Sequence, residues 1–163
     1  MPKVVSNSSP IIHLAKIGKL ELLKEYFQTI TVPEAVYREC VLEGKVREEV
    51  EIIKNADWIK VMQVESKKIV RLLQSLLDDG ESEAIALSLE IGADLILLDD
   101  SDAREKARLY GLKITGTIGI LLQAKIERKI DSLKETLDRL KESGFWLSNK
   151  LETRLLMEVD EQP

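Results

Sequence analysis

Short apolar runs alternate with helical apolar patterns along the chain, and this alternation restricts the folds that the sequence can adopt. Segments with apolar residues at helical spacing separate the runs. Strands that alternate with helices favour a doubly wound sheet of parallel strands. We therefore predict an α/β fold, with a central parallel sheet of four or five strands and helices on both faces. The predicted strands lie near residues 4–5, 29–32, 58–64, 94–98 and 113–115.

Polar residues follow two of these strands directly. Residues 7–9, Asn-Ser-Ser, follow the first strand, and Asp99 and Asp100 follow the uninterrupted apolar run 94–98. Such a run is typical of a parallel strand covered on both faces. Because sites in parallel sheets form at the C-terminal ends of strands, we expect the two polar groups to meet at one edge.

Other acidic residues extend this candidate site. Glu39 lies on the helix after the second strand, and Glu81 and Glu83 lie in the first turn of a helix predicted over 81–91, after a break at residues 79–80. Gathered carboxylates repel one another unless a cation or a proton intervenes. Oxygen ligands without Cys or His suit Mg²⁺ or Mn²⁺ better than zinc. Each acid also has a purely structural interpretation. Glu81 and Glu83 would stabilise the positive end of the helix dipole, and Glu39 would be a solvated surface residue.

The remaining distinctive side chains are expected to have structural roles. Cys40 is the only cysteine, which excludes an internal disulfide and a cysteine-rich zinc site. His13 is the only histidine and lies on an apolar helix. We predict that Trp58 and Trp146 are packing anchors rather than platforms for nucleobases.

The totals fit one domain, residues 1–163, with C-terminal helices at about 132–158 packing on it and a frayed end over 159–163. No apolar stretch is long enough to span a bilayer and no signal peptide is visible, so we expect a cytoplasmic protein with no membrane partner. The net charge of −5 argues against a protein that coats nucleic acid by charge alone. Any path for a nucleic acid must therefore be local, and Arg104 is the first candidate for a phosphate contact, with Arg38 second.

Five stretches resemble the PIN domain family. Residues 4–23 (VVSNSSPIIHLAKIGKLELL) resemble the opening of PIN domains and, more narrowly, of stand-alone archaeal and bacterial PIN-like proteins related to VapC-type toxins. Four later stretches agree in the same order. The resemblance covers nearly the whole chain and implies a PIN-like three-layer fold. The four stretches are 32–39 (VPEAVYRE), 80–88 (GESEAIALS), 97–104 (LLDDSDAR) and 111–121 (GLKITGTIGIL).

The resemblance also implies an activity. PIN domains bind Mg²⁺ or Mn²⁺ through three or four acids and hydrolyse single-stranded RNA. Carried over to this chain, Glu39, Glu81 and one of Asp99 and Asp100 match the catalytic and metal-binding acids. Ser8 matches a small hydroxyl residue beside the first acid and is expected to contact the substrate. The resemblance further implies a homodimer and, as in toxin–antitoxin pairs, an antitoxin protein partner.

One residue departs from the family pattern. PIN nucleases usually have aspartate where this chain has Asn7, which offers a neutral carbonyl as the metal ligand and removes one negative charge. Two functions therefore stay open: a metal-dependent ribonuclease, and a PIN-like protein- or RNA-binding module with weak or no catalysis. A receiver-like phosphoacceptor would need its acidic pair after the first strand, and no G-x-G-x-x-G or Walker motif follows that strand.

Overall fold

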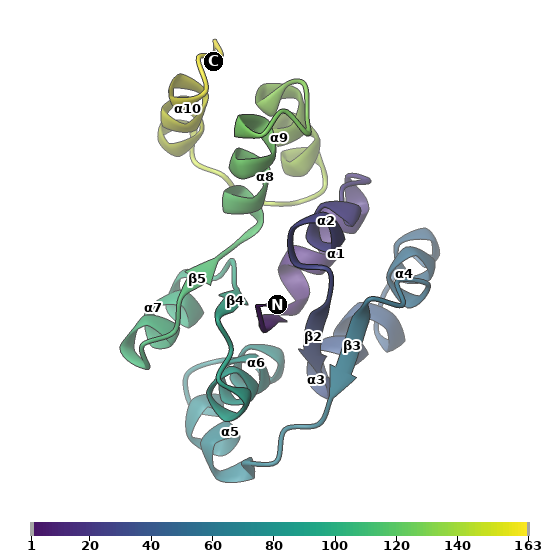
Figure 1. Ribbon diagram of the computed structural model, residues 1–163, viewed down its shortest axis with the longest axis vertical. Coiled ribbons are helices and arrows are strands. Elements are labelled where there is room, and N and C mark those ends of the chain that lie inside the picture. Colours follow the sequence, from purple (N-terminus) through teal and green to yellow (C-terminus); the bar gives the residue numbers. More distant parts are fainter. Residues whose placement is uncertain (1, 163) are drawn as a thin grey trace.

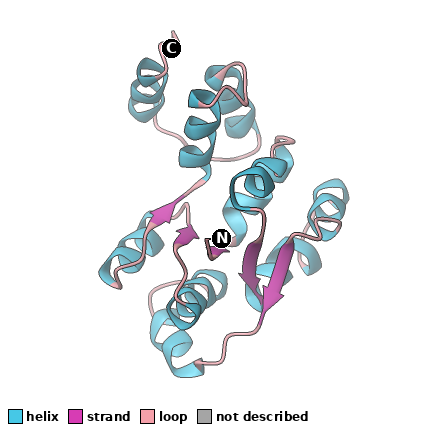
Figure 2. Ribbon diagram, in the orientation of Figure 1, coloured by secondary structure: helices cyan, strands magenta, loops and turns pink. Residues whose placement is uncertain are grey.

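The computed structural model describes residues 2–162, which form one sheet of five strands in the order β3-β2-β1-β4-β5. Every neighbouring pair is parallel. Figure 1 and Figure 2 show the strands in the middle of the molecule with helices around them. The predicted α/β fold with a parallel sheet is confirmed. The strands are β1 (Val4–Ser6), β2 (Ile30–Pro33), β3 (Ile59–Met62), β4 (Leu95–Leu97) and β5 (Ile114–Thr115).

Two buried apolar clusters cover the two faces of the sheet. Val4 and Leu97 belong to one cluster, and Val5 and Ile96 belong to the other, because successive residues of a strand face opposite sides. The second cluster includes residues of α5 (Lys67–Gln74), α6 (Asp79–Ile91) and α7 (Ser101–Leu109). The first includes residues of α1 (Ser8–Lys16), α2 (Glu21–Phe27), α4 (Arg47–Lys54), α8 (Thr117–Ile126), α9 (Leu133–Glu142) and α10 (Asn149–Glu158).

The C-terminal helices share the first cluster with the sheet. Figure 1 shows α8, α9 and α10 standing together as a group next to α1 and α2. Leu137 of α9 and Leu156 of α10 are buried in the same cluster as Val4 of β1. None of the helices within residues 2–162 is long and apolar enough to cross a membrane.

Two helices begin earlier than the sequence predicts. The Ser9-Pro10 pair predicts a helix that begins at Pro10 with Ser9 as its cap, whereas α1 begins at Ser8 with Asn7 in the capping position. α6 begins at Asp79 rather than at residue 81, because Asp78 caps it: the Asp78 side chain accepts from the Glu81 amide at 2.8 Å, and the Glu81 side chain accepts from the Asp78 amide at 3.2 Å. This reciprocal capping box places Gly80 inside the first helical turn instead of at a break.

The C-terminal segment is bonded to the rest of the domain through Glu161, whereas the sequence predicts a frayed end over 159–163; residue 163 lies outside the described residues. Glu161 accepts from the amides of Leu133 at 2.7 Å and Lys134 at 3.0 Å, so its carboxylate lies against the N-terminus of α9. Lys125 forms an ion pair with the same carboxylate at 3.2 Å. Burial alone would raise the pKa of Glu161, but these hydrogen bonds and the Lys125 charge outweigh it and lower the pKa.

We expect Glu161→Gln to lower the free energy of unfolding by about 1 kcal/mol at neutral pH, because the helix loses a charged partner. A carboxyl whose folded-state pKa is lowered stabilises the fold above its unfolded pKa and loses this effect as the pH falls through the folded value. The difference from native protein should therefore shrink below pH 4.5, the ordinary value for the group. Urea unfolding at several pH values measures this, with the exposed Glu158→Gln as the matched control. An equal loss at every pH would contradict the prediction.

Candidate functional site

The C-terminal ends of β1 and β4 lie side by side at one edge of the sheet. Their register pairs Ser6 with Leu97. The Asn7 amide then donates to the Leu97 carbonyl oxygen at 3.0 Å, which extends the pairing by one residue. Asn7 and the acidic pair that follows Leu97 are therefore at the same edge, as the sequence predicts.

Two buried side-chain oxygens lie beside Gly80. A Cβ added at Gly80 would overlap Glu39 Oε1 and would lie 3.1 Å from Asn7 Oδ1. Both oxygens are buried, and neither has a hydrogen-bond partner within residues 2–162. Ser8 Oγ donates to the other oxygen of Glu39 at 3.0 Å. Glycine permits this close approach because it has no side chain.

Glu39 reaches this position from an irregular helix. α3 (Glu34–Tyr37) continues into a π-helical stretch, η1 (Arg38–Leu42), and Glu39 is the second residue of that stretch. Short π-helical turns often occur at functional sites because they change the direction of a side chain. Burial of Glu39 raises its pKa, the Ser8 hydrogen bond opposes this, and the negative charges of Asp78 and nearby acids raise it further.

Glu81 lies among other acids but is engaged by its own helix. It is buried, and its carboxylate forms the capping box with Asp78. Burial raises the pKa of Glu81 to about 7, and the negative charges of Asp78 and Asp100 contribute to this rise. Glu83, the neighbouring candidate, instead accepts from the Ala35 amide at 3.2 Å. Asp78 was missed at the sequence level, although the D-x-x-E spacing of Asp78 and Glu81 is a capping signal.

Asp99 and Asp100 have different surroundings. The Asp99 carboxylate accepts from Ser9 Oγ, from the Thr117 amide and from Thr117 Oγ1, each at 2.7 Å. These bonds join the end of β4 to the starts of α1 and α8. Asp100 caps α7 by accepting from the Ala103 amide at 3.0 Å. The negative charge of Asp100 also acts on Glu81 and contributes to its raised pKa.

The oxygen donors fit a hard divalent cation only in part as they stand. Within residues 2–162, no group of three or more His, Cys, Asp or Glu side chains is placed to hold a metal ion. Asn7 Oδ1 and Glu39 Oε1 are unpaired and buried, which is the environment of a preformed oxygen ligand. Glu81 and Asp100 are engaged in helix caps and do not join these two oxygens as they stand.

The two arginines predicted to contact phosphate lie on different elements, Arg38 on η1 and Arg104 on α7. Arg38 is exposed at the start of η1. Arg104 of α7 donates to the Leu98 carbonyl oxygen at 2.9 Å. Gly116 allows this, because a Cβ there would lie 3.0 Å from Arg104 Nη1 and 2.6 Å from Asp99 Oδ1.

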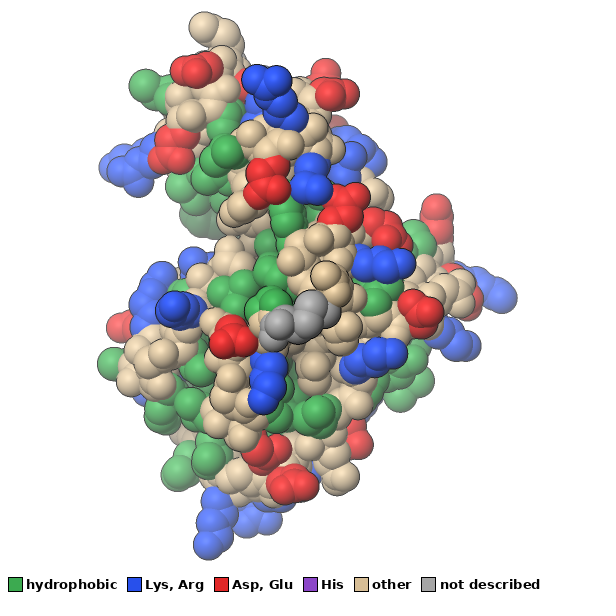
Figure 3. Space-filling model, viewed as in Figure 1, with side chains coloured by type: hydrophobic (Ala, Val, Ile, Leu, Met, Phe, Trp, Pro, Cys, Tyr) green, Lys and Arg blue, Asp and Glu red, His purple; other side chains and the backbone are tan. Residues whose placement is uncertain are grey.

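A hollow of about 610 Å³ opens beside Asp99, between α7 and β5 on one side and the start of α10 on the other. Figure 3 shows the surface recessed on the left, below the C-terminal helices, with Lys and Arg side chains gathered over α7. Trp146 lines the hollow and is 83% exposed, so the prediction that it is a packing anchor is wrong. Trp58 is buried, as predicted.

These features define a class of protein: a parallel α/β domain with oxygen-bearing side chains collected at the C-terminal edge of the central strands. A family model described as a PIN domain matches residues 3–161. The chain therefore belongs to the PIN domain family. Members of this family have a nuclease-type fold and generally depend on divalent metal ions. No curated protein matches the chain.

We expect Asp99→Ala to lower the free energy of unfolding by about 2–4 kcal/mol, since it removes three charge-assisted hydrogen bonds. Asp100→Ala should cost only about 1 kcal/mol, the usual effect of losing a helix cap. Urea unfolding of the two variants measures the difference. Equal losses would show that the Asp99 bonds do not hold β4 against α1 and α8.

Gly80→Ala should keep the fold while displacing Glu39, because the added carbon meets the mobile end of a side chain. The helix propensity of alanine offsets part of the cost, so stability should change by less than about 1 kcal/mol. Gly119→Ala is the matched control, because its added carbon would meet the side chain of Thr115 instead. Crystal structures of both variants test this, and an unmoved Glu39 in Gly80→Ala would contradict it.

Proposed function

We propose that the protein is a metal-dependent ribonuclease that cleaves single-stranded RNA, with Mg²⁺ or Mn²⁺ bound by Asn7, Glu39, Glu81 and Asp100. The observation that carries the proposal is the pair of buried, unpaired oxygens, Asn7 Oδ1 and Glu39 Oε1, beside Gly80. Buried polar atoms usually have a partner, and two acceptors facing one point would be satisfied together by a cation. The family match supports the same class of activity.

Each side chain has a role in this proposal. Ser8 orients Glu39 by donating to the carboxylate oxygen that does not face Asn7. The negative charge of Asp78 acts on both Glu39 and Glu81, and that of Asp100 acts on Glu81. This repulsion favours a positive ion among these carboxylates. A divalent ion bound there would activate water and stabilise the charge on the scissile phosphate. Asp99 positions α1 and α8 and is not a ligand in this proposal.

A second function is favoured by a specific observation. Asn7 carries no charge, and Glu81 and Asp100 are engaged in helix caps. These features suit a PIN-like domain that binds RNA or protein with weak or no catalysis. The finer expectations, a cytoplasmic toxin that forms a homodimer and pairs with an antitoxin protein, rest on the family resemblance and remain proposals.

Asn7→Asp separates the two functions. Restoring the carboxylate should increase the affinity for Mn²⁺ and the rate of RNA cleavage by roughly ten-fold or more, because ligand charge supplies much of the affinity for a hard cation. The measurement is cleavage of a panel of single-stranded RNAs in Mn²⁺ by native protein, Asn7→Asp and Glu39→Gln. Asp102→Asn, an exposed acid on α7, is the matched control and should behave as native protein.

Thermal unfolding gives a readout that does not depend on activity. Without metal, the new carboxylate of Asn7→Asp would lie buried beside Glu39, so its melting temperature should fall in EDTA and recover in Mn²⁺. If neither native protein nor Asn7→Asp cleaves more RNA than Glu39→Gln, and Mn²⁺ stabilises none of them, the nuclease proposal fails and the binding module takes its place.

A further inference from the structure

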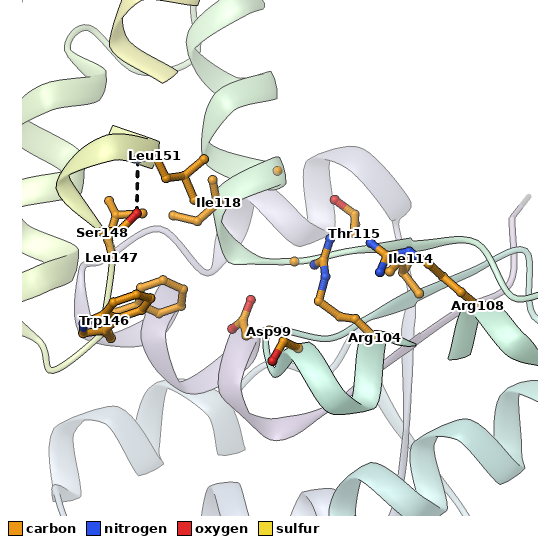
Figure 4. A pocket seen from close by; sticks show the side chains of 14 residues that line it. Asp99, Arg104, Arg108, Ile114, Thr115, Ile118, Trp146, Leu147, Ser148 and Leu151 are labelled. Carbon is orange, nitrogen blue, oxygen red and sulfur yellow. Dashed lines mark hydrogen bonds between the residues drawn. The ribbon is translucent and has the colours of Figure 1, made fainter. Parts of the chain in front are cut away.

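The hollow beside Asp99 has one cationic wall and one aromatic wall. Figure 4 shows Arg104 and Arg108 reaching from α7 toward β5, Trp146 on the opposite side, and Asp99 between them. Ile118 and Leu151 add apolar lining next to Trp146. The volume of about 610 Å³ is in the range of sites that bind small organic groups such as a nucleotide.

The cationic wall consists of two neighbouring arginines, and the negative charge of Asp99 acts on one of them, Arg104. Arg104 and Arg108 are four residues apart on α7, so they lie on the same face of that helix. Within residues 2–162, no carboxylate forms an ion pair with either guanidinium. Arg104 is held by the Leu98 carbonyl oxygen, whereas Arg108 is exposed. In a chain with a net charge of −5, two such neighbouring arginines favour an anionic ligand.

The aromatic wall is an exposed ring on an anchored backbone. Phe145, the residue before Trp146, packs edge-on against His13 with ring centroids 5.1 Å apart. Leu147, the residue after it, is buried in the first cluster. Trp146 between them is 83% exposed. The backbone on both sides is therefore fixed, and the indole remains free to stack on a planar group such as a nucleobase.

Two consecutive serines at the start of α1 lie between the hollow and the proposed metal site, and each bonds an acid of one of them. Ser9 donates to Asp99, which lines the hollow, and Ser8 donates to Glu39, which faces Asn7. The start of α1 thus separates the hollow from the oxygens beside Gly80. A strand bound in the hollow would lie next to the edge of the sheet where those oxygens are.

We propose that this hollow is a subsite for single-stranded RNA, in which Trp146 stacks on a base and Arg108, with Arg104, binds the adjacent phosphate. This inference rests on the proposed ribonuclease function and adds the surface that holds the substrate. Single-stranded RNA suits the site because it offers unpaired bases and phosphates in alternation, which match an aromatic wall beside a cationic wall.

Binding in EDTA tests the subsite without cleavage. Short single-stranded RNA should quench the tryptophan fluorescence of native protein but not of Trp146→Phe, in which the buried Trp58 is the remaining tryptophan. Trp146→Ala should weaken binding by roughly five-fold or more. Arg108→Ala should weaken binding and reduce the salt dependence by about one phosphate contact. The matched controls are Met157→Ala, exposed on α10, and Arg71→Ala, exposed on α5, which should bind as native protein does.

Two results would overturn the subsite. One is an affinity for RNA that is the same in Trp146→Ala as in the control Met157→Ala. The other is a Trp146 signal that depends on protein concentration and not on RNA, which would assign this face to a second copy of the chain. Cleavage in Mn²⁺ is measured separately, and Trp146→Ala is expected to raise KM more than it lowers kcat. RNA binding that depends on Trp146 in a protein that cleaves nothing would support the subsite and count against the ribonuclease proposal alone.

Discussion

The pairing of β1 with β4 in the middle of the sheet places Asn7 and the two serines after it at the same edge as Asp99 and Asp100. Because the two strands are parallel and in register, both chain segments leave the sheet at the same edge. The Asn7 amide extends this pairing by donating to the Leu97 carbonyl oxygen. α1 then begins at once, and its first two hydroxyls reach Glu39 on one side and Asp99 on the other. The short, polar turn from β1 into α1 therefore lies between Glu39 and Asp99 and bonds both of them.

The acids at this edge serve two demands that compete. Glu81 and Asp100 satisfy backbone amides at the starts of α6 and α7, which stabilises those helices. In the proposed metal site, the same carboxylates would join Asn7 and Glu39 as ligands. A cap is worth about 1 kcal/mol, which a bound divalent ion would readily offset. In the proposed function, Glu81 and Asp100 would cap their helices in the metal-free protein and would bind the cation when it is present.

Membership of the PIN domain family explains the architecture. Two features are particular to this chain: the neutral Asn7 and the exposed indole of Trp146. Asn7 reduces the charge at the proposed metal site. The C-terminal helices bring an exposed indole opposite the arginines of α7. The charge that would hold a metal and the charge that would hold a phosphate are kept on opposite sides of the α1 start. If the proposed subsite binds RNA, this separation would let an acidic protein present a local cationic surface to an anionic strand.

The sequence by itself determined the α/β class, the parallel sheet and the meeting of Asn7 with the acids after β4, because strand periodicity and the rule for strand ends are local signals. The sequence could not assign different roles to Asp99 and Asp100, because they are adjacent and are the same type of residue. Tertiary structure decided this, since the partners of Asp99, Ser9 and Thr117, lie 90 and 18 residues away. Packing also turned Glu83 toward Ala35 and left Trp146 exposed. Such contacts depend on how distant segments approach one another in space, and no local pattern of residues encodes that approach.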